Sequence, residues 1–349
     1  MAYDPQREDY QRLGLRFAHS LDGMDTRQAT RSFAAFGRRF AQDRDSLPQS
    51  DADRAFHLVA MATKLIDYQL PFADDDQAKK LIESGHKLLD EAIALDPQCY
   101  DAIRMKVASE APSFESFLDY LNDLADEVRT HCEEQLAEHA DDSTKERAHL
   151  HADLAMRPYV RWLSTQAEHA LICGRNKEAL RLAFACLDLD RHDVADARFT
   201  AALALAKLED EAGLDELEGR LKAWGTVRPA NDPWFLIARL CLCFKSFDRL
   251  GTQHWLKELL DTFPRAAEAL IRQIELPVGV FARLATVPYS EDELILAISE
   301  ATVLLQEGVD PMGRGTISTW LSEEVSQQHP EAMLTVMAEQ RNEQGRKGA

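Results

Sequence analysis

Glycine and proline are scarce in this chain, with 15 and 13 of 349 residues. Together they make up about 8% of the residues, against a usual share of about 12%. Because these two residues destabilise helices most, their scarcity favours helical structure. No sustained alternation of Val, Ile or Thr with polar residues marks a strand anywhere along the chain. The sequence therefore predicts the all-α fold class.

Long apolar runs are also missing. The longest nearly apolar stretch, 234–244, carries Arg239 inside it and falls far short of the roughly 20 residues that cross a bilayer. The N-terminus shows no basic segment followed by an apolar one, which is the pattern of a secretory signal. We therefore expect a cytoplasmic protein.

Positive charge is in deficit. The chain has 40 Lys and Arg against 60 Asp and Glu, a formal net charge of -20, and no Lys/Arg run exceeds two residues. A phosphate backbone repels such a surface, so nucleic acid is not an expected partner. The six cysteines are scattered through helix-like segments, and without a secretory signal we expect them to be reduced and buried.

Motifs of catalysis and metal binding are absent. The chain has no Gly-x-Ser-x-Gly elbow, no phosphate-binding loop and no Gly-x-Gly-x-x-Gly fingerprint. His149 and His151 point about 200° apart on a helix, and His131 with Glu134 lacks the His-Glu-x-x-His pattern. We expect no metal, no cofactor and no catalysis. An enzyme with a site between the N-terminal helices and the remainder of the chain stays open as an alternative.

Helical patterns divide the chain. The stretch 29–41 is amphipathic, 52–70 reads as a strong helix, and Ser290 with Glu293 has the capping-box spacing that starts a helix. Pro330 is expected to open the last helix, and 341–349 to fray. Four regions are predicted: an N-terminal helical region at 1–75, a degenerate repeat with long helices at 76–155, repeats at 156–275, and a C-terminal helical cap with a tail at 276–349.

A helix-turn-helix unit stands at 167–193. Gly174 suits the tight turn, and the small residues Ala167 and Ala179 allow two antiparallel helices to approach closely. This pattern is that of a tetratricopeptide repeat, a unit of about 34 residues. Weaker first-helix signatures recur at 197–204 and 234–241. The sequence thus predicts an α-solenoid of such repeats, closed by helical caps.

The order of these signatures resembles one known family. The matching segments are Arg157-Pro158-Tyr159-Val160-Arg161, Gly174-Arg175, Leu189-Asp190-Arg191-His192-Asp193, Phe263-Pro264, Val287-Pro288-Tyr289-Ser290 and Thr319-Trp320-Leu321. They are similar to bacterial tetratricopeptide proteins related to the suppressor-of-tumorigenicity-seven family. The resemblance covers about 77–321 and implies the repeat fold, but no chemistry. At 190–196 the chain departs from the family's usual repeat ending.

The concave face of a solenoid is its usual binding surface, lined by the first helix of each repeat. In the phase set by Gly174 the lining residues are Arg161, Ser164 and Glu168. Arg198 holds the equivalent row of the next repeat, and phasing the third repeat on Trp234 and Ala238 adds Arg239. Arginine forks suit carboxylates, so an acidic protein or peptide is the expected partner of a non-catalytic adaptor or scaffold. Two alternatives stay open: the arginines pair with acids of the chain itself, or the protein only associates with itself. If the arginines bind a partner, exchange of Arg161 and Arg198 for Glu should abolish binding with little change in melting temperature.

Overall fold

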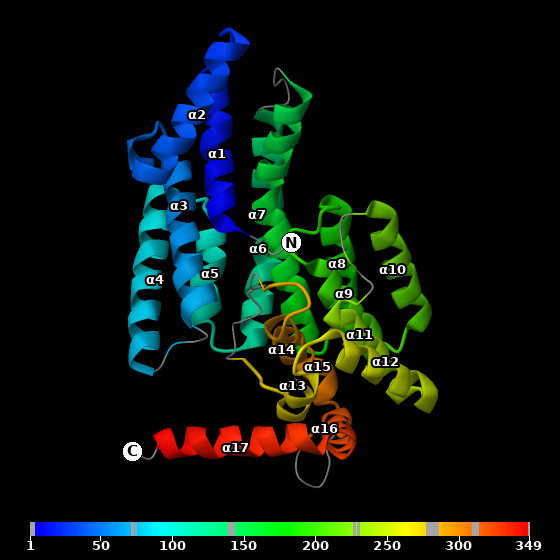
Figure 1. Ribbon diagram of the computed structural model, residues 1–349. Coiled ribbons are helices and arrows are strands. Elements are labelled where there is room, and N and C mark those ends of the chain that lie inside the picture. The colour runs from blue at the N-terminus through cyan, green and yellow to red at the C-terminus, as the bar shows by residue number, and fades with distance from the viewer. Residues whose placement is uncertain are drawn as a thin grey trace. The chain divides into compact units, whose positions relative to one another are not determined.

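The computed structural model describes residues 4–70, 73, 75–138, 144–225, 228, 231–276, 286–308 and 314–347. These residues form helices and connecting turns, with no strand among them, which confirms the all-α class (Figure 1). The chain divides into two compact units, a first unit of residues 3–166 and a second unit that begins at Ala167. The division lies inside the region 156–275 that the sequence assigned to repeats.

The first unit is built from the helices up to most of α7. They are α1 Pro5–His19, α2 Thr26–Asp43, η1 Arg44–Ser46, α3 Asp51–Thr63, η2 Lys64–Gln69, α4 Asp75–Leu95, α5 Tyr100–Glu110, α6 Phe114–Glu138 and α7 Lys145–Ile172.

Three apolar clusters hold the first unit together. The amphipathic stretch 29–41 lies within α2, and its Phe36 packs with Leu13 of α1. A second cluster joins α3, α4 and α5, and a third joins α5, α6 and α7 around the fully buried Trp162. These helices are therefore fixed to one another by ordinary apolar packing.

The segment 52–70, predicted as one helix, changes from an α-helix to a π-helix at Lys64. Residues 51–63 are α-helical, whereas Lys64–Gln69 form a π-helix with a wider turn. The widened turn presses Ile66 against α4 at Gly85, where an added Cβ would lie 2.6 Å from Ile66 Cδ1. Glycine at this position makes the close approach possible.

The second unit contains the last residues of α7 and the remaining helices. They are α8 Asn176–Leu189, α9 Ala197–Lys207, α10 Glu211–Trp224, α11 Pro233–Lys245, α12 Arg249–Thr262, α13 Ala266–Arg272, α14 Glu291–Glu300, α15 Thr302–Leu305, α16 Thr316–Gln328 and α17 Pro330–Lys347. Within this unit α9 packs against α8, α10 and α11, and α11 packs against α12 and α14 (Figure 1). Ala167 and Ala179, expected at a close helix crossing, are both fully buried.

One turn geometry recurs three times in the second unit. Gly174, Glu209 and Phe247 follow α7, α9 and α11, and they adopt positive φ values of 74°, 58° and 62°. The next backbone N–H bonds back to the carbonyl five residues earlier in every case, at 2.7 Å (Arg175 to Ala170), 3.0 Å (Asp210 to Leu205) and 2.9 Å (Asp248 to Cys243). This is the Schellman closure of a helix. We call these three positions the left-handed turns. Only the first carries the glycine that the sequence pattern requires.

The C-terminal helices agree in part with the expectation. Ser290 caps α14, accepting from the Glu293 N–H, and Pro330 opens α17. The tail expected to fray from residue 341 instead continues α17 to Lys347. Arg265 and Arg272 both pair with Glu339 of α17, at 2.9 and 2.8 Å, and so tie this helix to the α13 region.

Candidate functional site

Arg161 lies inside the first unit and is only 8% exposed. Its guanidinium donates to Glu8 of α1 at 2.8 Å and to Asp101 of α5 at 2.7 and 2.5 Å. Ser164, one turn further along α7, is also buried. In this structure Arg161 thus has the internal partners that the sequence left open as an alternative.

Three further arginines join the same acids. Arg12 bonds to Glu8 at 2.8 Å, Arg157 lies 3.4 Å from Glu8, and Arg104 lies 3.5 Å from Asp101. Arg157 also donates to Gln11 at 2.7 Å. We call these four arginines, with Glu8 and Asp101, the arginine network. It draws on α1, α5 and α7, helices distant in the sequence.

Both acids of the network are held in their charged form. Burial alone would raise the pKa of Asp101, but Arg161, Arg104 and Arg12 outweigh burial and lower it to about 2. Burial likewise opposes ionisation of Glu8, and Arg161, Arg12 and Arg157 together lower its pKa below the usual value. Glu8 and Asp101 are therefore ionised throughout the physiological range.

Arg198 stands in a buried cluster of the second unit. It donates to Asp193 at 2.7 Å and to Asp196 at 2.5 Å, and its Nε lies 3.7 Å from Asp232. Asp232 accepts from the Trp234 N–H at the start of α11, and the Trp234 ring stacks on Phe199 at 3.7 Å. The cluster thereby joins the α8–α9 turn to the first turn of α11.

The acids of this cluster exceed the positive charge that Arg198 supplies. Burial raises the pKa of Asp193 to about 6, and burial raises that of Asp232 to about 7, although Arg198 lowers both. Near neutral pH the cluster is therefore poised to take up a proton. Arg198 itself is 7% exposed, with its charge directed into the protein.

Arg239 has separate partners. It donates to Asp215 at 2.5 Å and to Glu218 at 2.9 Å, both on α10. Glu168, near the end of α7, is buried at 7% exposure. The proposed lining residues are thus buried side chains, and the three arginines among them pair with three different sets of acids. Whether a partner also contacts these five residues stays a prediction.

Large apolar side chains are exposed at one left-handed turn. Phe247 is 91% exposed and Leu250, at the start of α12, is 86% exposed. We call these two residues the apolar tip. A bulky residue with positive φ is a conformational outlier that costs about 1–2 kcal/mol. Strain at an exposed aromatic residue, with a second exposed apolar side chain close in the sequence, makes this turn a candidate binding site.

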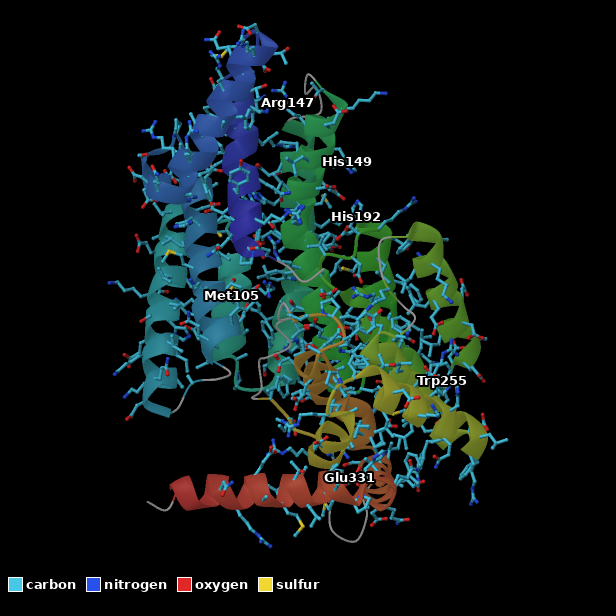
Figure 2. All side chains as sticks on the ribbon, in the orientation of Figure 1. Met105, Arg147, His149, His192, Trp255 and Glu331 are labelled. Atoms are coloured by element: carbon cyan, nitrogen blue, oxygen red, sulfur yellow. The ribbon has the colours of Figure 1, made fainter. Side chains whose placement is uncertain are left out.

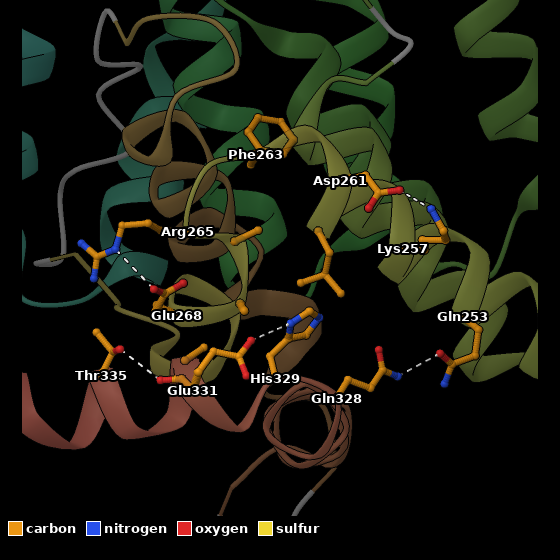
Figure 3. A pocket seen from close by; sticks show the side chains of 14 residues that line it. Gln253, Lys257, Asp261, Phe263, Arg265, Glu268, Gln328, His329, Glu331 and Thr335 are labelled. Atoms are coloured by element: carbon orange, nitrogen blue, oxygen red, sulfur yellow. Dashed lines mark hydrogen bonds and ion pairs between the residues drawn. The ribbon is translucent and has the colours of Figure 1, made fainter.

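A pocket of about 620 Å³ lies further along the same unit, between α12, α13, α16 and α17 (Figure 3). Its apolar part is made of Leu260, Phe263, Ala266, Ala267 and Ala332. Its charged side chains are paired with one another: Lys257 with Asp261, Arg265 with Glu268 at 3.5 Å, and His329 with Glu331 at 3.3 Å (Figure 3). The pocket therefore has an apolar part and a polar part whose side chains pair with one another, which suits a peptide segment more than a small charged ligand.

The apolar tip and the pocket share one face of α12. Leu250, Gln253 and Lys257 follow one another at the three- and four-residue spacing that places side chains on one side of a helix. Gln253 and Lys257 line the pocket, whereas Leu250 belongs to the tip. We call the surface from Phe247 to the pocket the α12 surface. The sequence did not indicate this surface, because binding was expected on the first helix of each predicted repeat, whereas Leu250, Gln253 and Lys257 lie on α12.

The described residues contain no group of three or more His, Cys, Asp or Glu that could hold a metal ion. His149 lies on α7 with its side chain 71% exposed, 3.9 Å from Asp153 (Figure 2). All six cysteines are free, and four of them are buried. Among the helices described here, none is both long and apolar enough to span a membrane.

Comparison with known proteins gives no relative: the chain matches no family model, no curated protein and no solved structure. The resemblance to the suppressor-of-tumorigenicity-seven family stays a prediction from the sequence.

Proposed function

We propose that the chain is a non-catalytic adaptor, a tetratricopeptide-like solenoid in its second unit that holds another protein against the α12 surface. The repeated left-handed turns support the solenoid, because they recur near the 34-residue period of that repeat. The packing of α9 on α11, each beside its own second helix, supports it as well.

The single observation that carries the adaptor function is the apolar tip. Phe247 and Leu250 are the most exposed of the large apolar side chains among the described residues, and they lie three positions apart in the sequence. Association with a partner removes both side chains from water and recovers about 1.5–3 kcal/mol for each. The tip is thus a good candidate for a binding hot spot.

The arginines that the sequence assigned to partner binding fit this role less well. Arg161, Arg198 and Arg239 are buried in ion pairs, and a partner would first have to displace the acids of the chain. Displacing a buried pair leaves a desolvated charge and costs several kcal/mol. The α12 surface needs no such displacement.

Quantitative affinity capture tests the adaptor function. The bait carries Phe247→Ser and Leu250→Ser, and the matched control carries Leu189→Ser, which replaces an apolar residue that is 49% exposed on α8. We expect one specific protein to be lost from the tip variant and retained by the wild type and the control. Retention of every captured protein by the tip variant would exclude the α12 surface.

Light scattering of the purified chain separates two kinds of partner. A dimer mass that falls to the monomer mass in the tip variant would identify a second copy as the partner. A monomer mass for both proteins would assign the surface to a different protein.

A further inference from the structure

The arginine network holds more positive than negative charge. Its four guanidinium groups face two carboxylates, both of which are ionised. One more carboxyl group, Asp67 of η2, lies near Arg104, but burial raises its pKa to about 7. Near neutral pH it supplies only part of a charge. A positive excess of this kind stands out in a chain whose formal net charge is -20.

The excess charge is on the side toward solvent. The side chains of Glu8 and Asp101 are 2% and 4% exposed, whereas those of Arg12, Arg104 and Arg157 keep 21%, 18% and 17%. The acids therefore form the interior of the network and the arginines its edge. An anion that approaches this edge meets guanidinium groups before it meets a carboxylate.

Two of the arginines flank one acid. Arg12 on α1 and Arg157 on α7 both contact Glu8, and Arg161 uses the same carboxylate. Arg161 also pairs with Asp101, whereas Glu8 is the carboxylate that Arg12 and Arg157 share between them. Arg12 is also held in place by packing of its guanidinium over the Phe56 ring, at 4.2 Å from the ring centre.

Arg104 has a hydrogen-bond donor that the network leaves without an acceptor. Its Nε atom is buried and has no hydrogen-bond acceptor among the described residues, while its other nitrogens bond to Thr165 and Asp101. A buried donor without an acceptor is costly and uncommon. The network therefore lacks acceptor oxygens as well as negative charge.

We propose that the edge of the arginine network binds the oxyanion group of a small molecule, a carboxylate or a phosphate, between Arg12 and Arg157. Both groups supply negative charge to the two arginines that share Glu8, and both match the planar fork of a guanidinium. Arg161 and Arg104 stand behind this pair and contribute to the positive potential.

Titration calorimetry of the full chain with sodium sulfate tests the proposal at constant ionic strength, with chloride as the balancing anion. We expect heat of binding and a melting temperature that rises with sulfate at constant ionic strength. Parallel titrations with inorganic phosphate and with succinate show which oxyanion the site prefers. The absence of both heat and a specific rise in melting temperature for all three anions would overturn the proposal.

Variants locate the site. Arg157→Gln and Arg12→Gln should each weaken binding of the preferred anion by about tenfold or more, because each removes a charged hydrogen bond. Arg129→Gln is the matched control, since Arg129 lies on α6 of the same unit in an exposed pair with Glu133. Equal weakening in the control, or unchanged binding in both network variants, would contradict the assignment.

Discussion

Glu8 and Arg161 stand 153 positions apart in the chain and meet in a buried ion pair of 2.8 Å. The pair joins α1 to α7, and Asp101 brings α5 into the same contact. The N-terminal helix of the first unit is therefore held by charge as well as by the apolar packing of Leu13 with Phe36.

Replacement of Arg161 by Met should destabilise the protein by about 3 kcal/mol, because Glu8 and Asp101 would each lose a buried, hydrogen-bonded cation. Urea denaturation measures the loss. The control Arg129→Met breaks an exposed pair and should cost less than about 1 kcal/mol. A similar small loss in Arg161→Met would show that the network contributes little to stability.

Burial also changes the expected outcome of charge reversal at Arg161 and Arg198. The sequence predicted that two Glu residues at these positions would leave the melting temperature nearly unchanged. Each Glu would instead lie among buried acids, beside Glu8 and Asp101 or beside Asp193 and Asp196. We therefore expect a large fall in melting temperature, measured by differential scanning calorimetry.

Stability should rise as the pH falls from 8 to 5. The pKa of Asp193 is raised to about 6 and that of Asp232 to about 7, above the value of 3.8 expected in the unfolded chain. In this range the folded state binds more protons than the unfolded state, so the free energy of unfolding decreases as the pH rises. Asp101 and Glu8, whose pKa values are lowered, act in the opposite direction but only below about pH 4.5.

Asp232→Asn isolates this effect. Asn is as good an N-cap as Asp, so the cap on Trp234 is kept while the titrating group is removed. Urea denaturation at pH 5, 6, 7 and 8 should show a smaller pH dependence in the variant, by about 2 kcal/mol across the range. An unchanged slope would show that Asp232 does not carry the proton.

The strain at the apolar tip predicts a stabilising substitution. Phe247→Gly should raise the free energy of unfolding by about 1 kcal/mol, because glycine adopts positive φ without strain and Phe247 is almost fully exposed. Glu209→Gly, at the matching turn, should act in the same direction. Gly174→Ala should lower the free energy of unfolding, because alanine is strained at the positive φ of this position. Chemical denaturation of the three variants measures the sign of each change in the free energy of unfolding.

Two glycines of α10 should respond in opposite ways to alanine. A Cβ on Gly213 would lie 2.7 Å from Leu205 Cδ2 and 2.6 Å from Asp210 Oδ2, whereas a Cβ on Gly219 would meet no atom within 4 Å. We expect Gly213→Ala to destabilise by about 1–3 kcal/mol and Gly219→Ala to stabilise by up to about 1 kcal/mol. Thermal melts of the two variants measure the difference, and equal effects would contradict the packing of α10 on α9.

Local patterns of the sequence predicted the helices well. The scarcity of Gly and Pro, the capping residues at Ser290 and the periodicity at 29–41 all act over a few residues, and the structure confirms each of them. The π-helical turn was not predictable in this way. Its residue Ile66 lies against Gly85 of the next helix, and this contact between helices is not contained in any local pattern.

The candidate sites required contacts that no local pattern contains. The predicted repeat placed Arg161 on a binding surface. Its partners Glu8 and Asp101 lie on α1 and α5, outside the residues of that repeat. With 60 acids in the chain, no single acid could be chosen as a partner from sequence. The apolar tip carries no local signal either, because the sequence pattern expects glycine at such a turn, whereas Phe247 adopts the positive φ there.

The left-handed turns have a consequence for protein engineering. Main-chain bonds hold them, so the side chain at the turning position is not needed for closure and differs each time: glycine at 174, glutamate at 209 and phenylalanine at 247. Position 209, where a non-glycine residue already adopts positive φ and its side chain is 62% exposed, is therefore a natural attachment point. A dye or an affinity handle placed there should leave the main-chain closure of the turn and the surface at 247 unchanged.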